Sequence, residues 1–347
     1  NMNYKISIIV PFFYKERIVK ENTPDFDLLS FNKCLSAIFK SKYKNYEVIL
    51  VSDNSSPSSI KLTKKYPYKL IKLKKNNGAA NARNQGAKLA SGQILVFLDS
   101  DVEIKDNSLA IINNYNNKKN NVGILQGVYS HKPNYNSMTQ YVHSYQCYHV
   151  FFETKKKKYT ETLCTCFVAI KKKYFFKVKG FNSNFSGAET EDLDLGYRLM
   201  AKNHKIQLEQ RLKTIHHTNY GILYFIKKIV SRHTSEMKMY LRNKKDIFKR
   251  TQQLSHTPVL ISIILIAIKI LIIFGNFFYK IPNFNEILIS LIFLFILTNI
   301  KFLKFLLNSK GFLVAVRSAF YMFFHFFLLM MCIVFGILDF YVFRNKY

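Results

Sequence analysis

Two aspartates separated by a single serine, Asp99 and Asp101, follow directly after the apolar run Ile94–Leu98. The run has the length and composition of a buried strand, so both acids are expected where that strand ends. Carboxylates are seldom buried without a partner, and two of them at a strand end offer the hard oxygen ligands that a divalent cation takes. A strand-to-loop turn with two solvated acids explains the segment equally well, and the rest of the chain has to decide.

The elements that position these acids alternate along residues 1–220. Short β-rich runs at 6–10, 46–51, 70–73 and 94–98 are interleaved with helical patterns at 28–40 and 79–90. This alternation predicts right-handed crossovers and a mainly parallel sheet. Ligands of such sheets bind beyond the carboxyl ends of the strands. Because Pro11, Asp53 and Asp99 all stand at such ends, we expect them to converge on one cleft.

Composition excludes several classes of protein. Lys and Arg number 52 against 21 Asp and Glu, a formal charge of +31, which indicates an anionic membrane surface or nucleic acid as partner. No arginine-rich tail or zinc-finger spacing occurs, so nucleic acid is not expected. The five cysteines form no paired CxxC set, which argues against a disulfide framework or a zinc site. Neither a G-x-G-x-x-G after the first strand nor a P-loop is present, so dinucleotide oxidoreductases and P-loop enzymes fit poorly.

The composition changes near residue 257. Three apolar segments follow, near 259–278, 287–307 and 318–338, and a bilayer span needs about 20 such residues. Buried core helices are the alternative, which three segments in so short a stretch disfavour. Basic residues precede the first segment, so the positive-inside rule predicts an integral protein of the cytoplasmic membrane with a cytoplasmic N-terminal domain. Those residues are Arg242, Lys244, Lys245, Lys249 and Arg250.

Two features complicate this topology. Three spans would leave Arg344 and Lys346 outside, against the positive-inside rule, unless residues 312–320 lie in the interface. Residues 221–240 form an amphipathic basic pattern that is typical of a helix lying on a membrane surface. An ordinary packed helix of the N-terminal domain explains that pattern nearly as well. We expect residues 221–256 to form an interfacial region and linker, and 257–347 to form about three transmembrane helices.

Five motifs occur in a defined order along the chain. They are Ile8-Ile9-Val10-Pro11, Val51-Ser52-Asp53-Asn54-Ser55-Ser56, Asn77-Gly78 with Ala82-Arg83-Asn84-x-Gly86, Asp99-Ser100-Asp101, and Glu191-Asp192-Leu193-Asp194-Leu195-Gly196-Tyr197-Arg198-Leu199. Each motif is weak alone, but in this order and spacing the chain resembles the family 2 glycosyltransferases over about residues 4–240. The resemblance implies an inverting enzyme. It also implies an α/β, Rossmann-like GT-A catalytic domain over residues 1–220, followed by an α-helical membrane domain.

The resemblance implies a donor site. Pro11, Asp53, Arg83 and Asp99 would bind the nucleotide, with Asp53 accepting a hydrogen bond from a pyrimidine base. Asp99 and Asp101 would bracket the sugar nucleotide, with Asp101 on Mg²⁺ or Mn²⁺. Such a cation neutralises the charge that develops on a nucleoside diphosphate leaving group. A helix N-cap is the alternative role for Asp53, and a surface salt bridge is the alternative for Arg83.

The resemblance also implies catalytic and further metal-binding residues. Asp192 would be the general base for the acceptor hydroxyl, with Glu191 beside it. The crowding of these two acids with Asp194 raises the pKa of at least one of them. An acidic helix N-terminus is the alternative for the whole cluster. His217, in preference to His216, would complete the metal site or meet the diphosphate, and a structural role for both is equally compatible with their position after a β-like segment.

Together these features predict a membrane-bound enzyme of cell-envelope glycan biosynthesis. It would transfer a sugar from a nucleotide-sugar donor, with a UDP-sugar expected, to a lipid-linked or glycan acceptor at the cytoplasmic face. Processive family members carry Q-x-x-R-W, of which residues 229–233 retain only Arg232, so one sugar per encounter is expected. A processive polysaccharide synthase and a catalytically inactive membrane scaffold are the alternatives. The intact acids Asp99, Asp101 and Asp192 count against the scaffold.

Overall fold

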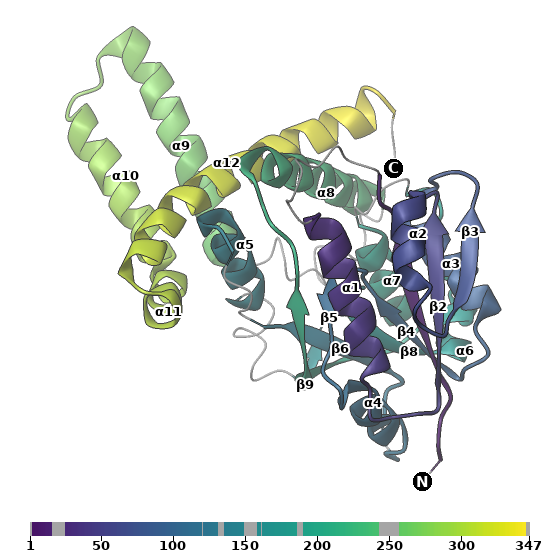
Figure 1. Ribbon diagram of the computed structural model, residues 1–347. Coiled ribbons are helices and arrows are strands. Elements are labelled where there is room, and N and C mark those ends of the chain that lie inside the picture. Colours follow the sequence, from purple (N-terminus) through teal and green to yellow (C-terminus); the bar gives the residue numbers. More distant parts are fainter. Residues whose placement is uncertain are drawn as a thin grey trace. The chain divides into compact units, whose positions relative to one another are not determined.

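The computed structural model comprises two compact units (Figure 1). The first unit contains residues 1–133 and 149–218, and the second contains residues 134–148 and 219–347. Within them the structure describes residues 2–15, 25–119, 121–130, 135–148, 158–160, 162–185, 190–242 and 257–344. The basic residues 244–250 that bear on the predicted membrane topology lie outside this described part.

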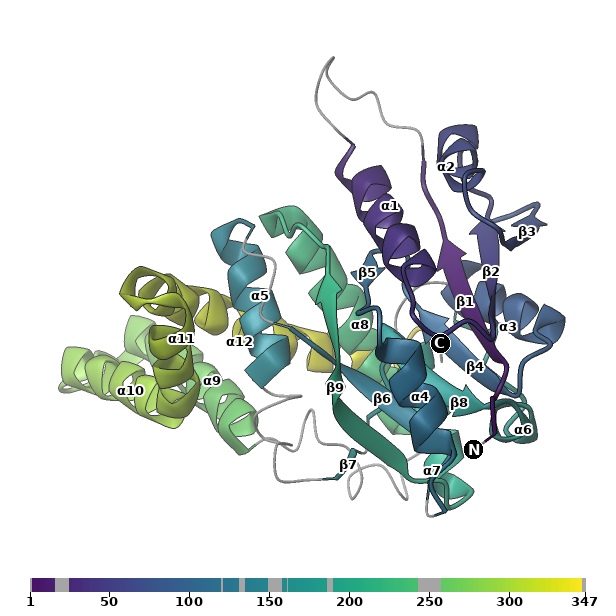
Figure 2. The ribbon, with the colours of Figure 1, turned by 60° about the horizontal axis from the view of Figure 1, so that its bottom comes forward.

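The first unit is built on one mixed sheet with the strand order β3-β2-β1-β4-β8-β6-β9-β5, to which β7 adds by pairing with β9 (Figure 2). The strands are β1 (Ile6–Phe12), β2 (Tyr46–Asp53), β3 (Lys69–Leu73), β4 (Ile94–Leu98), β5 (Val102–Glu103), β6 (Ile124–Tyr129), β7 (Tyr159–Thr160), β8 (Phe167–Lys171) and β9 (Ile206–His216). The parallel half that the sequence predicts is β3-β2-β1-β4. Beyond it, β8 runs antiparallel to both β4 and β6, so the sheet as a whole is mixed.

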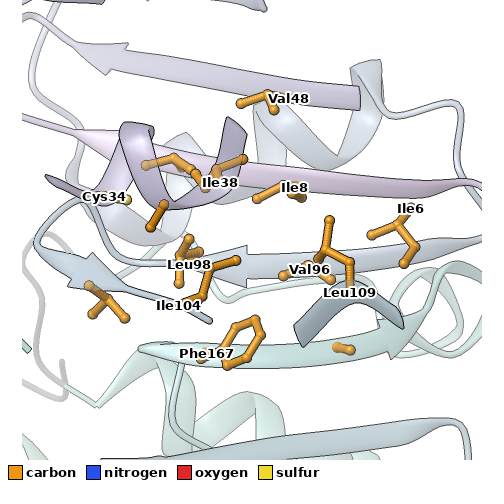
Figure 3. Packing of buried hydrophobic residues seen from close by; sticks show 14 of the residues in the cluster. Ile6, Ile8, Cys34, Ile38, Val48, Val96, Leu98, Ile104, Leu109 and Phe167 are labelled. Atoms are coloured by element: carbon orange, nitrogen blue, oxygen red, sulfur yellow. The ribbon is translucent and has the colours of Figure 1, made fainter. Parts of the chain in front are cut away.

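Two apolar clusters cover the two faces of this sheet. The helices of the unit are α1 (Phe26–Phe39), α2 (Pro57–Thr63), α3 (Gly78–Leu89), α4 (Ser108–Asn116), α6 (Lys172–Lys177) and α7 (Glu191–Ala201). In β1, Ile6, Ile8 and Val10 face the cluster shared with α1 and α4, whereas Ile9 faces the cluster shared with α3, α6 and α7. Figure 3 shows the first cluster. Alternation of this kind explains why strands covered on both faces are apolar throughout.

Helix α3 lies very close to the sheet because of a glycine. A Cβ atom added to Gly86 would lie 2.5 Å from Ile9 Cγ2 and 3.2 Å from Val51 Cγ2. Any larger residue would therefore push α3 away from β1 and β2. Gly86 belongs to the third motif. Its lack of a side chain thus sets the distance between α3 and the strands β1 and β2.

The second unit is helical and comprises α5 (Ser137–Cys147), α8 (Ile222–Arg242), α9 (Thr257–Tyr279), α10 (Phe284–Thr298), α11 (Ile300–Lys310) and α12 (Phe312–Tyr341). Two helices, α9 and α12, are long and apolar enough to cross a membrane. The middle predicted segment is instead broken into α10 and α11, which are bent by 63°. The break falls at Asn299, whose Nδ2 donates to Ser262 Oγ (2.8 Å) and to the Phe295 carbonyl (2.9 Å).

A partly buried carboxylate in β2 connects the parallel strands through its hydrogen bonds. Glu47 in β2 accepts hydrogen bonds from Ser7 Oγ (2.6 Å), from Ser91 N and Oγ (2.6 and 2.8 Å) and from Lys69 Nζ (2.7 Å). Burial raises the pKa of Glu47, but these hydrogen bonds outweigh it and lower the pKa to about 2. Because this pKa is depressed, the stabilisation is present above the unfolded value near pH 4.5 and is lost as the pH falls towards 2.

We therefore expect Glu47→Gln to lower the free energy of unfolding by about 2 kcal/mol at pH 7. The difference from the parent chain should shrink steadily between about pH 5 and pH 2, because the parent loses the charge that the variant lacks. Urea unfolding of the detergent-solubilised protein at several pH values measures this. Asp106→Asn, which breaks only the exposed pair with Lys42, should leave stability nearly unchanged. A difference that is constant from pH 7 to pH 2.5 would contradict the assignment.

Candidate functional site

Asp53, at the end of β2, holds the N-terminus of α3. Its Oδ1 accepts from Asn77 N (3.0 Å) and its Oδ2 accepts from Gly78 N (2.9 Å). Gly78 has φ +84°, a left-handed conformation that glycine adopts without strain, which explains the Asn77-Gly78 motif. Burial raises the pKa of Asp53, and the two backbone N–H groups only partly offset this. Asp53 therefore binds the start of α3, and Pro11 lies nearby in the sheet, paired with Val51 of β2.

Arg83, on α3, bridges two acids that are far apart in the sequence. Its Nη2 lies 2.7 Å from Asp99 Oδ1, and its Nη1 lies 2.8 Å from Glu191 Oε1. The side chains of Arg83 and Glu191 are 4% exposed, whereas that of Asp99 is 31% exposed. Burial lowers the pKa of Arg83, but the two carboxylates raise it by more, so the guanidinium stays charged. The arginine is thus a buried bridge between the end of β4 and the start of α7, and not a surface salt bridge.

The three acids of α7 have different surroundings. Glu191 is paired with Arg83, and Asp194 Oδ2 accepts from Arg198 Nε (2.8 Å) and lies 2.7 Å from Arg198 Nη2. Asp192, between them, is buried in the first turn of the helix and accepts from the N–H of Leu193 (2.8 Å). The Glu191 pair therefore joins α7 to Arg83 of α3, whereas the Asp194 pair lies within α7 itself. Asp192 is oriented by the same anchored turn.

Asp101 meets one of the two histidines at the end of β9. Its Oδ2 lies 3.2 Å from His216 Nε2 and accepts from Thr218 Oγ1 at 3.2 Å. The strand pairing fixes this arrangement, because Val102 of β5 pairs with His216 and the Asp101 carbonyl accepts from His217 N (2.8 Å). Burial raises the pKa of Asp101, but the attraction of His216 lowers it by more. The carboxyl is 34% exposed, so a ligand can reach it.

His217 belongs to a different pair. Its Nε2 lies 2.8 Å from Glu103 Oε2, and burial lowers its pKa. For His216, burial lowers the pKa, but Asp101 raises it by more, and the net direction is upward. Neighbouring residues of an extended strand point to opposite sides, which separates the two histidines. His216 is therefore the one that the structure brings to Asp101.

The donor set at Asp101 fits a hard divalent cation. Two cis ligands with bonds of about 2.1 Å to Mg²⁺ or Mn²⁺ lie about 3 Å apart, and Asp101 Oδ2 and His216 Nε2 are separated by 3.2 Å. Among the described residues, no cluster of three or more His, Cys, Asp or Glu side chains could hold a metal by itself. A cation bound here would therefore need further oxygen ligands from its substrate or from water.

Several contact residues of this region were not anticipated. Thr218 contacts both Asp101 and His216, and the Tyr129 ring stacks on His216 with centroids 5.3 Å apart. Tyr14 donates to Ser100 Oγ at 3.1 Å and so holds the middle residue of the acidic motif. Thr218 comes two residues after His216. In an extended segment this spacing places both side chains on the same side, so the sequence could have indicated that Thr218 lies beside His216. Tyr14 follows β1 and Tyr129 ends β6, so no pattern near His216 or Ser100 in the sequence points to either of them.

Two protein-family models match segments that lie largely within the first unit. Residues 28–178 match the family model described as glycosyl transferase family 2, and residues 146–220 match one described as the N-terminal domain of galactosyltransferase. The first match makes the chain similar to the family 2 glycosyltransferases over less than half of its length. Its fold is shared with the mannosyltransferase PcManGT from Pyrobaculum calidifontis, solved with GDP-Man and Mn²⁺. The TM-score is 0.57 at 14% identity, over 96% of this chain and 87% of that one. The fold is therefore GT-A.

Curated relatives match the chain over shorter stretches. The UDP-Glc:alpha-D-GlcNAc-diphosphoundecaprenol beta-1,3-glucosyltransferase WfgD of Escherichia coli is 32% identical over 28% of this chain and 36% of that protein. The uncharacterized glycosyltransferase YibD of Escherichia coli is 28% identical over 30% and 28%. The poly(ribitol-phosphate) beta-glucosyltransferase of Bacillus spizizenii is 31% identical over 36% and 19%. Each match spans well under two thirds of the relative.

We expect Arg83→Met to lower the free energy of unfolding by about 3–5 kcal/mol, because it leaves Asp99 and Glu191 without their shared cation. Glu191→Gln should destabilise by less. In the double variant the two losses should fall short of their sum by about 1–3 kcal/mol, since both remove one interaction.

Urea unfolding of the four proteins of this cycle gives the coupling. Arg211→Met is the matched control, because Arg211 is 61% exposed and its pair with Glu209 should contribute little. Strictly additive losses for Arg83→Met and Glu191→Gln would mean that the bridge does not stabilise the protein.

Proposed function

We propose that the protein transfers a single sugar, with inversion, from a UDP-sugar to a lipid-linked or glycan acceptor at the cytoplasmic face of the membrane. The observation that carries this proposal is the Asp99–Arg83–Glu191 bridge. It joins the acid at the end of β4 to helix α7, whose first turn contains the proposed base, Asp192. A donor held by the first acid and an acceptor activated by Asp192 would therefore meet in a fixed geometry.

In the donor half of the site, Asp101 and His216 would hold Mg²⁺ or Mn²⁺, with Asp99 beside them. Such a cation supplies positive charge to the diphosphate as the bond to the sugar breaks. Tyr129 stacks on the His216 ring and would hold its plane for this role, whereas the contact of Thr218 with Nε2 would give way when a cation binds there. Asp53 would accept a hydrogen bond from the base, since carboxylate oxygens have further lone pairs beyond those used by Asn77 and Gly78.

In the acceptor half of the site, Asp192 takes the proton of the attacking hydroxyl. The hydroxyl oxygen forms a bond to the anomeric carbon on the face opposite the diphosphate, and the bond from that carbon to the diphosphate oxygen breaks. One such displacement inverts the configuration. General-base assistance of this kind contributes about 10²–10⁴-fold to a rate. Glu191 cannot share this role without breaking its buried ion pair with Arg83.

The acceptor class is supported from two directions. The full name of WfgD specifies a diphosphoundecaprenol acceptor, which is a lipid carrier. This chain has two helices apolar enough to span a membrane, which would keep the enzyme beside such a carrier. The processive alternative is favoured by a poly-beta-1,6-N-acetyl-D-glucosamine synthase of Staphylococcus epidermidis, 33% identical over 21% of this chain. Retention of Arg232 alone from Q-x-x-R-W favours single transfer.

Asp192→Asn should abolish acceptor-dependent release of nucleoside diphosphate, with a rate loss of about 10²–10⁴-fold, because the amide cannot take the proton. Affinity for the nucleotide should remain nearly unchanged. The assay supplies Mn²⁺, a panel of nucleotide sugars and a membrane lipid extract. Asp194→Asn on the same helix is the control and should retain most of the rate. A variant at Asp192 that turned over like the parent would exclude this base, and long products would revive the processive alternative.

The two histidines provide a matched test of the metal site. His216→Gln should weaken Mn²⁺ binding in the presence of UDP by about tenfold or more, because it removes the ligand beside Asp101. His217→Gln should bind Mn²⁺ like the parent, since His217 is paired with Glu103. Electron paramagnetic resonance of free Mn²⁺ measures this without turnover. Equal losses in both variants, or loss only in His217→Gln, would contradict the assignment.

A further inference from the structure

The last helix, α12, has the composition of a membrane span but is too long to be one from end to end. Its 30 residues correspond to about 45 Å of helix, whereas a hydrocarbon core is about 30 Å thick. Length and composition therefore leave open which part of α12 is in lipid. The helix that α12 packs against decides this question.

That helix is α8, which runs beside the C-terminal half of α12 in the same direction (Figure 1). Four contacts follow in the same order along both helices: Phe225 with His325, Ile229 with Cys332, Met237 with Gly336, and Lys238 with Asp339. From the first contact to the last, α8 advances by 13 residues and α12 by 14. At 1.5 Å per residue the two helices run in the same direction and stay in contact for about 20 Å.

The contact between these helices is close. A Cβ atom added to Gly336 would lie 2.6 Å from Met237 Cβ, so the two backbones approach as they do at small-residue helix interfaces. Near the end of the contact, Lys238 Nζ lies 3.0 Å from Asp339 Oδ2, and the lysine side chain is 6% exposed. Helices joined in this way lie at one depth relative to a membrane.

Helix α8 cannot lie in hydrocarbon. It carries six charged residues in 21, namely Lys227, Lys228, Arg232, Glu236, Lys238 and Arg242. Charges inside a bilayer are costly and need partners or water. Because residues 325–339 of α12 lie beside α8 along their length, they share its depth. We propose that α12 does not cross the membrane, and that its C-terminal half lies with α8 in the interfacial layer on the side of the catalytic domain.

The surface of α12 in this half fits lipid. Its exposed residues are Val334, Phe335, Ile337, Leu338 and Tyr341, each between 39% and 51% exposed. They recur at helical spacing and form one apolar stripe. Exposed basic residues flank the stripe, Lys227 on α8 and Arg344 after α12. An apolar stripe with flanking cations matches the boundary between acyl chains and anionic head groups.

The crossing element is then the hairpin of α9 and α10. Helix α12 meets the open end of this hairpin, where Phe295 of α10 lies 5.8 Å from the Phe323 ring and Val259, Ile263 and Ile266 of α9 join the same cluster. The apolar residues nearer the turn are exposed, among them Phe274, Phe277, Phe278, Ile289 and Phe293. Helix α10 is only about 22 Å long, so the bilayer thins or the hairpin tilts around it.

This topology agrees with the charge distribution. The hairpin turn, residues 280–283, lies on the far side of the membrane and contains one basic residue, Lys280. The basic residues of α11, α12 and the tail all return to the near side: Lys301, Lys304, Lys310, Arg317 and Arg344. Three crossings would put Arg344 on the far side, against the positive-inside rule.

Labelling from one side of the membrane tests the proposal. Phe343→Cys and Asn283→Cys are expressed in bacterial cells and treated with a membrane-impermeant maleimide, before and after permeabilisation. We expect Asn283→Cys to react in intact cells and Phe343→Cys to react only after permeabilisation. Reaction of Phe343→Cys in intact cells would overturn the proposal. The parent chain, treated in parallel, measures labelling of its five native cysteines.

Depth measurements give an independent answer, because the chain contains no tryptophan. Phe327→Trp marks the middle of α12, and Leu271→Trp marks α9. Each variant is reconstituted in phosphatidylcholine–phosphatidylglycerol vesicles with lipids brominated at graded depths. We expect shallow bromines to quench Phe327→Trp most strongly and deep bromines to quench Leu271→Trp most strongly. Maximal quenching of both by deep bromines would show that α12 crosses the bilayer.

Discussion

The guanidinium of Arg83 is the group on which the arrangement of the site depends. A buried cation must be paired, and here one fork of N–H donors joins Asp99 at the end of β4 to Glu191 at the start of α7. A lysine could not make both contacts in this geometry, because its ammonium is a single point of charge. The bridge therefore fixes the distance between two segments that the chain supplies 92 residues apart.

The position of that guanidinium depends in turn on where α3 lies. Asp53 accepts the first N–H groups of the helix, and Gly86 allows its second half to sit against β1 and β2. The second and third motifs thus describe one mechanical unit, a helix attached at one end and packed closely at the other. Asp53 serves this unit and, in our proposal, the nucleotide base as well. A residue with both duties is expected to be intolerant of change for two separate reasons.

The sequence predicts those parts of the fold that local patterns encode. The parallel strands β1 to β4 follow from apolar runs interleaved with helical periodicity, and the acids at their ends follow from where the runs stop. Insertion of β8 between β4 and β6 has no local signature, because antiparallel pairing depends on partners brought from elsewhere. The sequence also could not predict which of His216 and His217 lies beside Asp101, since this depends on the register of β5 against β9.

The membrane unit shows a different limit of sequence reasoning. Hydropathy measures the average polarity of the residues in a helix. Whether that helix lies in the membrane also depends on the helices that it packs against. Helix α12 is apolar on the face buried against its neighbours and apolar on its exposed stripe, so its average is that of a span. Helix α8, in contact with it, carries charges that no hydrocarbon layer accommodates. Our proposal for the depth of α12 rests on this contact, which extends for about 20 Å.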